Sequence, residues 1–327
     1  MSIINKIEKV RNKRKITFEN ICTEWLVYKK RMVKESSYAN YTYSIKKYLI
    51  PEFGRFSLRQ LEKYDFNEYV EELRQNLSPK TVRDIISNLK AILTLAGDKY
   101  DCKIKVKNII SPKQDLEPLA ILNHREKNKL ERYCLRENSL KSIGIIVCLY
   151  TGLRVGEICA LRWKDIDLEK RELHVRYTLQ RIYKNSEKST QIIIDKPKTK
   201  TSVRAIPISN KIYDLLKELK CQYKDEDFFL TGNPYKFVEP RNYQYNFKLI
   251  LEASKVKKYK FHILRHTFST DCIEVGMDIK SLSEILGHST VEITLNKYVH
   301  SSYKTKKKFL EKLWLWEKTL AKHWKIW

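Results

Sequence analysis

The spacing of apolar residues predicts a bundle of helices over residues 16–105. The clearest helix starts at Ser78, a residue type favoured at helix N-caps, and at Pro79, which suits the first helical turn. Its apolar stripe consists of Val82, Ile85, Ile86, Leu89, Ile92, Leu93 and Ala96. Three shorter helices are expected before it: one capped by Thr17, one from Ser36 to Leu49 that Pro51 and Gly54 end, and one from Asp65 to Arg74.

Two segments without helical periodicity flank this bundle. Residues 1–15 are polar, basic and too few to fold alone, so we expect an N-terminal arm. Residues 106–118 combine lysines with Ser111, Pro112 and Pro118, which indicates a linker.

A second domain of mixed periodicity is expected over residues 119–300. Helical spacing recurs at 123–135, 140–150 and 154–161, and again from residue 210 onward. Alternating residues predict three strands, at 172–177, 191–195 and 203–208, which we expect to form one sheet with residues 196–202 as a lysine-rich hairpin turn. An apolar tail helix is predicted over 301–327. The expected fold class is mainly α with a small antiparallel β-sheet (α+β).

The charge balance indicates a polyanionic partner. Lysine and arginine number 65 against 39 acidic residues, which gives a net charge of +26. Nucleic acid is the commonest partner for such an excess. No apolar run approaches the roughly 18–20 residues of a membrane-spanning helix, and the N-terminus lacks the apolar core of a secretory signal. We therefore expect a cytoplasmic protein that binds no membrane.

Cofactor sites are not expected. The seven cysteines are odd in number and no two are spaced CxxC, which argues against a disulfide framework and a zinc ribbon. The sequence has neither clustered carboxylates for two metal ions nor a GxxxxGK[ST] loop for ATP.

Five short segments carry residue types suited to chemistry on a phosphodiester. In order, they are TGLRVGE with Arg154, PKTKTSVRAIP with Lys198, HILRH with His262 and Arg265, LGHS with His288, and NKYVH with Tyr298. Together they closely resemble the tyrosine recombinase (phage integrase) family. The resemblance covers nearly the whole chain from residue 17 and is strongest to integrases of Gram-positive conjugative transposons and temperate phages. It implies a SAM-like core-binding domain at 16–105 and a catalytic domain at 119–300.

The resemblance also implies catalytic roles. Tyr298 would be the nucleophile, and the scissile phosphate would be surrounded by Arg154, Lys198, His262, Arg265 and His288. The chemistry agrees, because two guanidiniums can each hold two phosphate oxygens with a fork geometry that lysine lacks. Lys198, on a hairpin, is the candidate general acid for the leaving 5′-oxygen. His288 could donate to a phosphate oxygen or accept the tyrosine proton. His174, His266 and His300 are given no catalytic role.

Other residues are candidates for DNA contact. The helix that starts at Ser78 has a polar face opposite its apolar stripe, and the expected contacts there are Lys80, Arg83, Ser87, Lys90 and Thr94. Lys200, two positions beyond Lys198, is a further candidate.

The sequence departs from the family in two respects. Tyr298 follows His288 by ten residues, where many relatives have nine. Residues 1–15 also cannot supply the extra domain with which some members bind distant arm sites.

The resemblance implies double-stranded DNA as partner and a homo-tetramer assembled on it, with room for an accessory DNA-bending or excision factor. The tail helix could pack on its own domain or be exchanged between protomers. Two other functions stay open: a type IB-like topoisomerase, and a DNA-binding regulator without catalysis.

Overall fold

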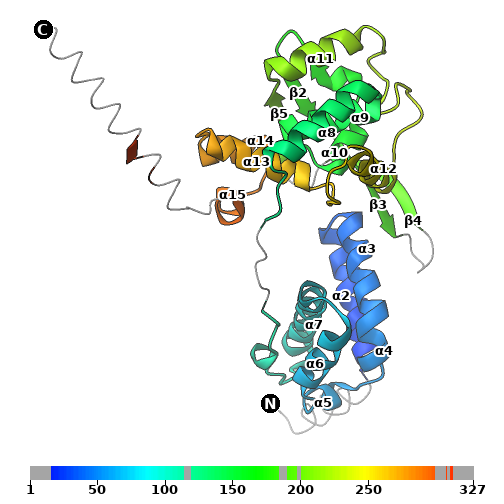
Figure 1. Cartoon of the computed structure of the whole chain (residues 1–327). Helices are drawn as coiled ribbons and strands as arrows, with labels where there is room; N and C mark the ends of the chain where they lie inside the picture. The colour runs from blue at the N-terminus through cyan, green and yellow to red at the C-terminus, as the bar shows by residue number, and fades with distance from the viewer. Residues whose placement is uncertain are drawn as a thin grey trace, which may run out of the picture. The chain divides into compact units, whose positions relative to one another are not determined.

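The computed structural model describes residues 16–113, 119–183, 190–196 and 200–298, together with the separate positions 307, 310 and 311 (Figure 1). For residues 183, 200 and 296–298 only the backbone is described. The expected arm at 1–15, Lys198 and nearly all of the expected tail helix lie outside these residues. The chain divides into two units, residues 1–117 with 181–193, and residues 118–180 with 194–327.

Residues 16–113 of the first unit are helical, as the periodicity predicts. Its helices are α2 (Phe18–Met32), α3 (Glu35–Ser44), α4 (Ile50–Phe53), α5 (Leu58–Leu61), α6 (Phe66–Asn76) and α7 (Pro79–Tyr100), with a π turn η1 (Ile45–Leu49) and a 3₁₀ turn η2 (Val106–Asn108). The caps are those read from the sequence: Thr17 accepts a hydrogen bond from the backbone of Asn20, and Ser78 accepts one from Thr81. These bonds satisfy amides that a helix start leaves unpaired.

Aromatic rings form the centre of this unit's core. Phe53 is fully buried and lies edge-on to Phe18, Tyr64 and Tyr69, with ring centroids 4.9 to 5.7 Å apart. The apolar stripe of α7 packs into the same cluster, so its polar face is left at the surface.

The prediction that Pro51 ends the second helix was wrong, whereas Gly54 does end the helical path as the C-cap of α4. The chain passes from α3 through the π turn into α4, and Pro51 lies in the first turn of α4. Proline lacks an amide hydrogen, and its ring clashes with the carbonyl four residues earlier in a regular α-helix. A wider π turn before it, in which the amide of Ile50 bonds to the carbonyl of Ile45, lets the helical path continue.

The second unit combines helices with short strands. The helices are α8 (His124–Glu137), α9 (Leu140–Thr151), α10 (Val155–Ala160), α11 (Asn210–Lys220), α12 (Pro240–Ala253), α13 (Ile263–Glu274), α14 (Ile279–Leu286) and α15 (Val291–Tyr298), with 3₁₀ turns η3 (Trp163–Asp165) and η4 (Lys200–Ser202). The strands are β1 (Ile166–Asp167), β2 (Glu172–Val175), β3 (Thr178–Tyr183), β4 (Thr190–Asp195) and β5 (Arg204–Pro207). Residues 181–183 of β3 and 190–193 of β4 are counted with the first unit.

The strand pairing differs from the single sheet expected. β2 lies between β1 and β5 in one antiparallel sheet, in which Leu173 faces Ile206, whereas β3 and β4 form a separate two-stranded sheet. The predicted pairing of 191–195 with 203–208 was therefore wrong, and β3 was missed. Leu173 and Val175 of β2 and Ile206 of β5 are buried, while β4 has no residue that is fully buried. Burial of an apolar face selects strand partners, and the alternation alone did not show which strands share a face.

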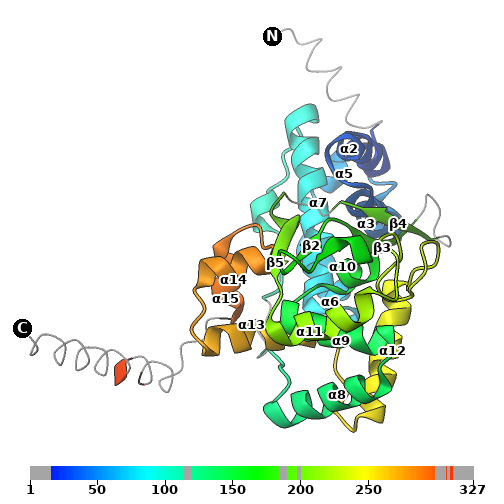
Figure 2. The ribbon, with the colours of Figure 1, turned by 90° about the horizontal axis from the view of Figure 1, so that it is seen from above.

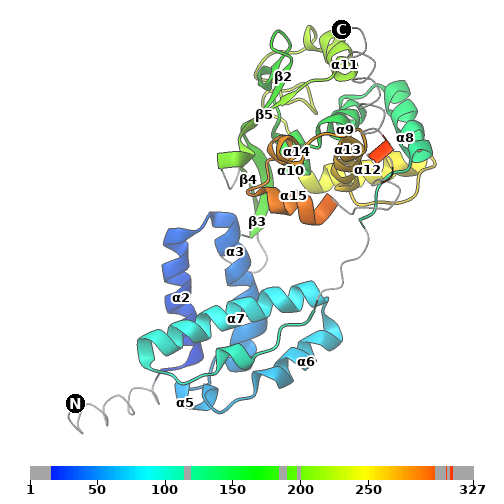
Figure 3. The same cartoon turned by 90° about the vertical axis from the view of Figure 1, so that its left-hand side faces the viewer.

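Helix α9 organises the second unit and leads to the site. It is apolar all round, buried along nearly its whole length, and packs against α8, α11, α12 and α13. A side chain at Gly144 would meet the hydroxyl of Tyr243 at 2.5 Å, so glycine permits this close packing. The C-terminal end of α9 lies beside α13, and α13, α14 and α15 form one cluster (Figures 2 and 3).

The expected fold class, mainly helical with small antiparallel sheets, is confirmed. Within the described part of the chain, no helix has the length and apolar character needed to cross a bilayer.

Candidate active site

Arg265 is the most buried charged residue of the candidate site. Its side chain is 1% exposed and extends from α13 between the ends of two other helices. One guanidinium nitrogen donates to the carbonyl of Gly152 at the end of α9 (2.9 Å), and the other donates to the carbonyl of Leu286 at the end of α14 (2.6 Å). Helix C-termini present unpaired carbonyls and a partial negative charge, so these two ends hold the guanidinium in place.

His288 is held between Arg265 and helix α15. Its Nε2 lies 2.9 Å from the Arg265 guanidinium, and its Nδ1 lies 2.7 Å from the hydroxyl of Thr294. The preceding residue, Gly287, ends α14 with a φ of +62°, a backbone conformation that favours glycine. The helix end thereby turns sharply and places His288 next to Arg265.

Arg154 reaches the same segment from the start of α10. One guanidinium nitrogen donates to the carbonyl of Gly287 (3.2 Å), and the other donates to the carboxylate of Glu157 (2.7 Å). About a third of the Arg154 side chain is exposed, so part of its guanidinium can reach a ligand. Arg154 and Arg265 thus contact consecutive carbonyls, those of Gly287 and Leu286.

Glu157 connects two arginines inside the unit. Its carboxylate accepts two hydrogen bonds from Arg204 of β5, at 3.0 and 3.1 Å, as well as the one from Arg154. Burial by itself would raise the pKa of this carboxyl, but the guanidinium of Arg204, with that of Arg154 behind it, lowers the pKa to about 2. Arg204 also donates to the carbonyl of Ile285. The backbone of residues 285–287 is therefore contacted by Arg204, Arg265 and Arg154 in turn.

His262 occupies the N-cap position of α13, three residues before Arg265, and is exposed. Its ring lies edge-on to that of His266, with centroids 4.5 Å apart. His266, to which the sequence assigned no role, therefore contacts a candidate catalytic residue.

Two predicted residues are only partly placed. Tyr298 is the last residue of α15, the helix that carries Thr294, and its backbone alone is described. Lys198 lies outside the described residues, between β4 and η4, where Lys200 begins the 3₁₀ turn. The structure thus brings together Arg154, Arg265 and His288, and it places the helix of Tyr298 in contact with His288.

Sequence reasoning missed three members of this arrangement: Glu157, Arg204 and Thr294. Glu157 and Arg204 lie inside the motifs TGLRVGE and PKTKTSVRAIP. A glutamate three residues into a helix is a capping signal and could have been noted. Nothing local indicates that it pairs with an arginine 47 positions later in the chain.

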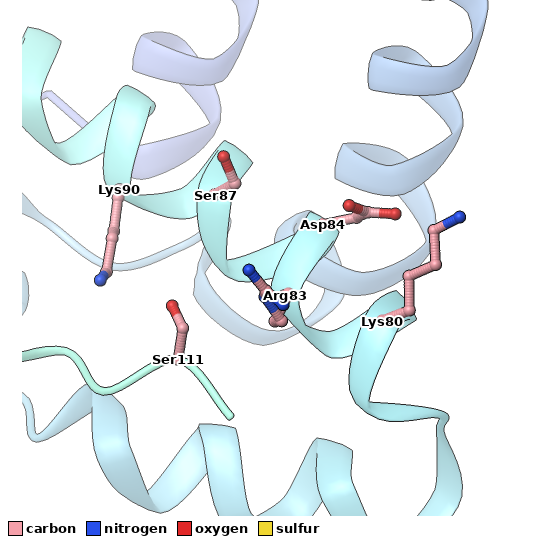
Figure 4. Close-up of a pocket in the computed structure, with 6 residues that line it drawn as sticks. All are labelled: Lys80, Arg83, Asp84, Ser87, Lys90 and Ser111. Atoms are coloured by element: carbon pink, nitrogen blue, oxygen red, sulfur yellow. The ribbon is translucent and has the colours of Figure 1, made fainter. Parts of the chain in front are cut away.

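The polar face of α7 forms a second candidate surface, in the first unit (Figure 4). A pocket of 430 Å³ is lined by Lys80, Arg83, Asp84, Ser87, Lys90 and Ser111. The side chains of Lys90 and Ser111 point toward one another across it (Figure 4). Four of the five residues expected on this face line the pocket. Thr94 does not, and its hydroxyl bonds back to the carbonyl of Lys90 at 2.8 Å.

No three His, Cys, Asp or Glu side chains come together as a metal site would require in the ranges that the structure describes.

The candidate site lies within a region that matches a known family model. Residues 116–305 match the model described as the phage integrase family. The chain belongs to the phage integrase family. Residues 17–74 match the N-terminal SAM-like domain described for phage integrases. The family predicted from the motifs and the enzyme class, a tyrosine recombinase, are therefore confirmed.

Relatives within the family include proteins of mobile elements. The XerC-like tyrosine recombinase of Caldanaerobacter subterraneus subsp. tengcongensis is 29% identical, over 91% of this chain and 83% of that protein. The ICEBs1 integrase of Bacillus subtilis is 25% identical, over 94% of this chain and 85% of that protein. The solved structure of the Tn1549 transposon integrase in complex with transposon right end DNA has a TM-score of 0.73 at 23% identity, over 91% of this chain and 99% of that chain.

Proposed function

We propose that this phage integrase family member integrates and excises a mobile element by cutting and rejoining DNA through a 3′-phosphotyrosyl intermediate at Tyr298. The observation that carries the proposal is the cluster of Arg154, Arg265 and His288. Arg154 and Arg265 donate to the carbonyls of Gly287 and Leu286, and Arg265 also contacts His288. The Tyr298 helix is attached to His288 through Thr294. Such a cluster of donors suits the charge that develops on a phosphate under attack.

The proposed step conserves the energy of the broken bond. The Tyr298 oxygen forms a bond to phosphorus while the bond from phosphorus to the 5′-oxygen breaks. The tyrosine proton passes to His288, and Lys198 supplies a proton to the departing 5′-oxygen. Arg154 and Arg265 hold the non-bridging oxygens, and His262 lies three residues before Arg265 as a further donor. Attack by the free 5′-hydroxyl of another strand reverses the step and reseals the DNA.

We assign DNA contact to the α7 pocket. Lys80, Arg83 and Lys90 bring three positive charges to one side of the helix, and an arginine or lysine at each phosphate is the usual means of positioning a protein on a duplex. The single carboxylate there, Asp84, reduces the local charge without cancelling it. Lys200 is proposed as a further contact in the second unit.

Arg83→Ala should weaken duplex binding and make it less sensitive to salt, because each lost phosphate contact releases fewer counterions. We expect the slope of log affinity against log salt to become shallower by about 1. Lys99→Ala is the matched control, since Lys99 lies near the other end of α7 and is paired with Glu24 at 2.8 Å. Filter binding over a range of salt gives both slopes. Equal slopes for the two variants would remove α7 from the DNA interface.

The assembly is proposed on the family resemblance. Four protomers would bring two sites together on the nucleoid, with an accessory DNA-bending or excision factor, and the tail at 301–327 would be exchanged between neighbours. We propose domain limits of 16–105 for core binding, 106–118 for the linker and 119–300 for catalysis.

A mixing experiment tests the function and separates it from its two alternatives. Two duplexes carrying the element's end sequences, each with its own label, are incubated with the protein, and a supercoiled plasmid is treated in parallel. Recombination predicts products that carry both labels. Plasmid relaxation without joint products would indicate a topoisomerase, and binding alone would indicate a regulator.

A further inference from the structure

Two arginines share the carboxylate of Glu157, but they bind it in different ways. Arg204 makes a fork contact, with one terminal nitrogen on each carboxylate oxygen, at 3.1 and 3.0 Å. The side chain of Arg154 makes a single contact, from one nitrogen to one oxygen at 2.7 Å, and its backbone amide donates to the other oxygen at 2.9 Å. The fork is the stronger and geometrically more specific arrangement of an arginine on a carboxylate.

The two guanidiniums also differ in the hydrogen-bond donors that remain available. The side chain of Arg204 is 6% exposed and makes four hydrogen bonds, two to Glu157 and two to backbone carbonyls. The side chain of Arg154 is 35% exposed and uses two of its five N–H groups, on Glu157 and on the carbonyl of Gly287. Three N–H groups of Arg154 (5 − 2) therefore have no acceptor among the residues that the structure describes, and they can bind the oxygens of a phosphate.

Arg204 itself cannot move toward a ligand. Its backbone lies in β5, where it pairs with Val175 of β2. Its side chain packs against the turn after α14, where a Cβ at Gly287 would lie 3.0 Å from the Arg204 guanidinium and 3.1 Å from its Cδ. Both ends of the residue are thus fixed, so that any effect of Arg204 on DNA must pass through the groups it contacts.

We infer that Arg204 is a positioning residue that acts through Arg154: by occupying the fork position on Glu157, it leaves the Arg154 guanidinium partly exposed, with N–H groups for the scissile phosphate. The inference rests on the proposed function, because this phosphate is the one that Tyr298 attacks. A carboxylate as buried as that of Glu157 requires a cation, and Arg154 is the other cation in contact with it. Without Arg204, Arg154 should leave the carbonyl of Gly287 and take the fork position itself, which turns its donors away from the DNA.

The first test measures single-turnover cleavage of a nicked suicide substrate by full-length Arg204→Met. We expect cleavage to slow about 10²-fold, the lower end of the cost of losing one preorganised donor. A substrate with a methylphosphonate at the scissile position has no charge there and one non-bridging oxygen fewer, so its cleavage depends less on Arg154. On that substrate the slowing should be about tenfold smaller, as expected for one charge-assisted hydrogen bond. A loss of packing alone would slow both substrates equally.

The second test adds Glu157→Gln to Arg204→Met. Glutamine keeps an oxygen for the amide at the start of α10, but it has no charge with which to hold Arg154. The double variant should therefore cleave about tenfold faster than Arg204→Met alone, a coupling of ordinary size for side chains in contact. Glu157→Gln by itself should be slow, because it leaves the buried guanidinium of Arg204 without its anion.

Arg176→Met is the matched control. Arg176 pairs with the buried carboxylate of Asp165 at 2.7 Å, a pair that includes neither Arg154 nor Glu157. Its loss should affect the two substrates by the same factor. A duplex shift on a native gel shows that each variant is folded. If Arg204→Met fails that check, Arg204→Lys, which keeps the buried charge but lacks the fork, is compared on the same two substrates with the same expectation.

The outcomes separate this inference from the function on which it rests. Equal slowing on both substrates, or a double variant no faster than Arg204→Met, would overturn the role of Arg204 and leave the proposed function intact. If Tyr298→Phe still forms the covalent complex, the proposed function itself fails.

Discussion

Lys198→Ala is expected to slow cleavage of an ordinary DNA strand by about 10²–10⁴-fold, the usual contribution of a general acid. The departing 5′-oxygen is a strongly basic leaving group that needs a proton as its bond to phosphorus breaks. Lys198 follows β4 in the sequence, and a lysine has a long stem with which to reach that oxygen.

The decisive comparison uses a 5′-phosphorothiolate, whose sulfur leaves without a proton. Lys198→Ala should cleave this substrate at nearly the wild-type rate, because the missing proton is no longer needed. Lys200→Ala is the matched comparison: as the loss of a proposed DNA contact, it should slow cleavage of both substrates by the same factor. If Lys198→Ala slows cleavage of both substrates equally, Lys198 only binds the phosphate and is not the general acid. If Lys200→Ala is slow on the ordinary strand but cleaves the phosphorothiolate at nearly the wild-type rate, the general acid is Lys200 and not Lys198.

The sequence was sufficient for most of the helical elements and for the motifs that carry Arg154, Arg265 and His288, but it missed Glu157, Arg204 and Thr294. Helix caps such as Ser78 and Asn123 are local signals, and each acts on amides within three residues of itself, so a linear reading finds them. The same holds for Arg154 and His288, which belong to short motifs with a recognisable order.

The features that could not be predicted depend on contacts between distant parts of the chain. Arg204 pairs with Glu157 across 47 positions, and β2 pairs with β5 rather than β5 with β4. The π turn before Pro51 also required the structure, since proline after an apolar run normally indicates a helix end. Thr294 was overlooked because a lone threonine in a helix gives no sign of burial.

Residues 285–288 form a short segment that several arginine side chains of the site contact. Arg204, Arg265 and Arg154 each donate to one of three consecutive carbonyls. Three cations brought this close repel one another, and the ionised carboxylate of Glu157, with its pKa lowered to about 2, offsets part of that repulsion. A bound DNA phosphate would offset more, so the site is arranged to favour an anion.

The second large effect is expected from Tyr298→Phe, which removes one hydroxyl oxygen and with it the proposed nucleophile. Without that oxygen no bond to phosphorus can form, even if the arginines still hold the scissile phosphate. The α7 surface and the arginine cluster are unchanged, so the variant should still bind the duplex and lose at most the roughly 0.5–1.5 kcal/mol of one neutral hydrogen bond.

Tyr133→Phe provides the matched loss of a phenolic hydroxyl elsewhere in the second unit. Tyr133 lies on α8, where its ring is 5.7 Å from the guanidinium of Arg136. That contact uses the ring face and not the hydroxyl, so this variant should cleave as the wild type does.

The most direct measurement is a denaturing gel of the protein incubated with a labelled, nicked suicide substrate, in which a nick near the cleavage site lets a short fragment diffuse away and traps the covalent complex. The wild type and Tyr133→Phe should each give a band of DNA joined to protein, and Tyr298→Phe should give none while still shifting the same DNA on a native gel. A covalent band at the wild-type level from Tyr298→Phe would contradict the assignment of the nucleophile and the mechanism built on it.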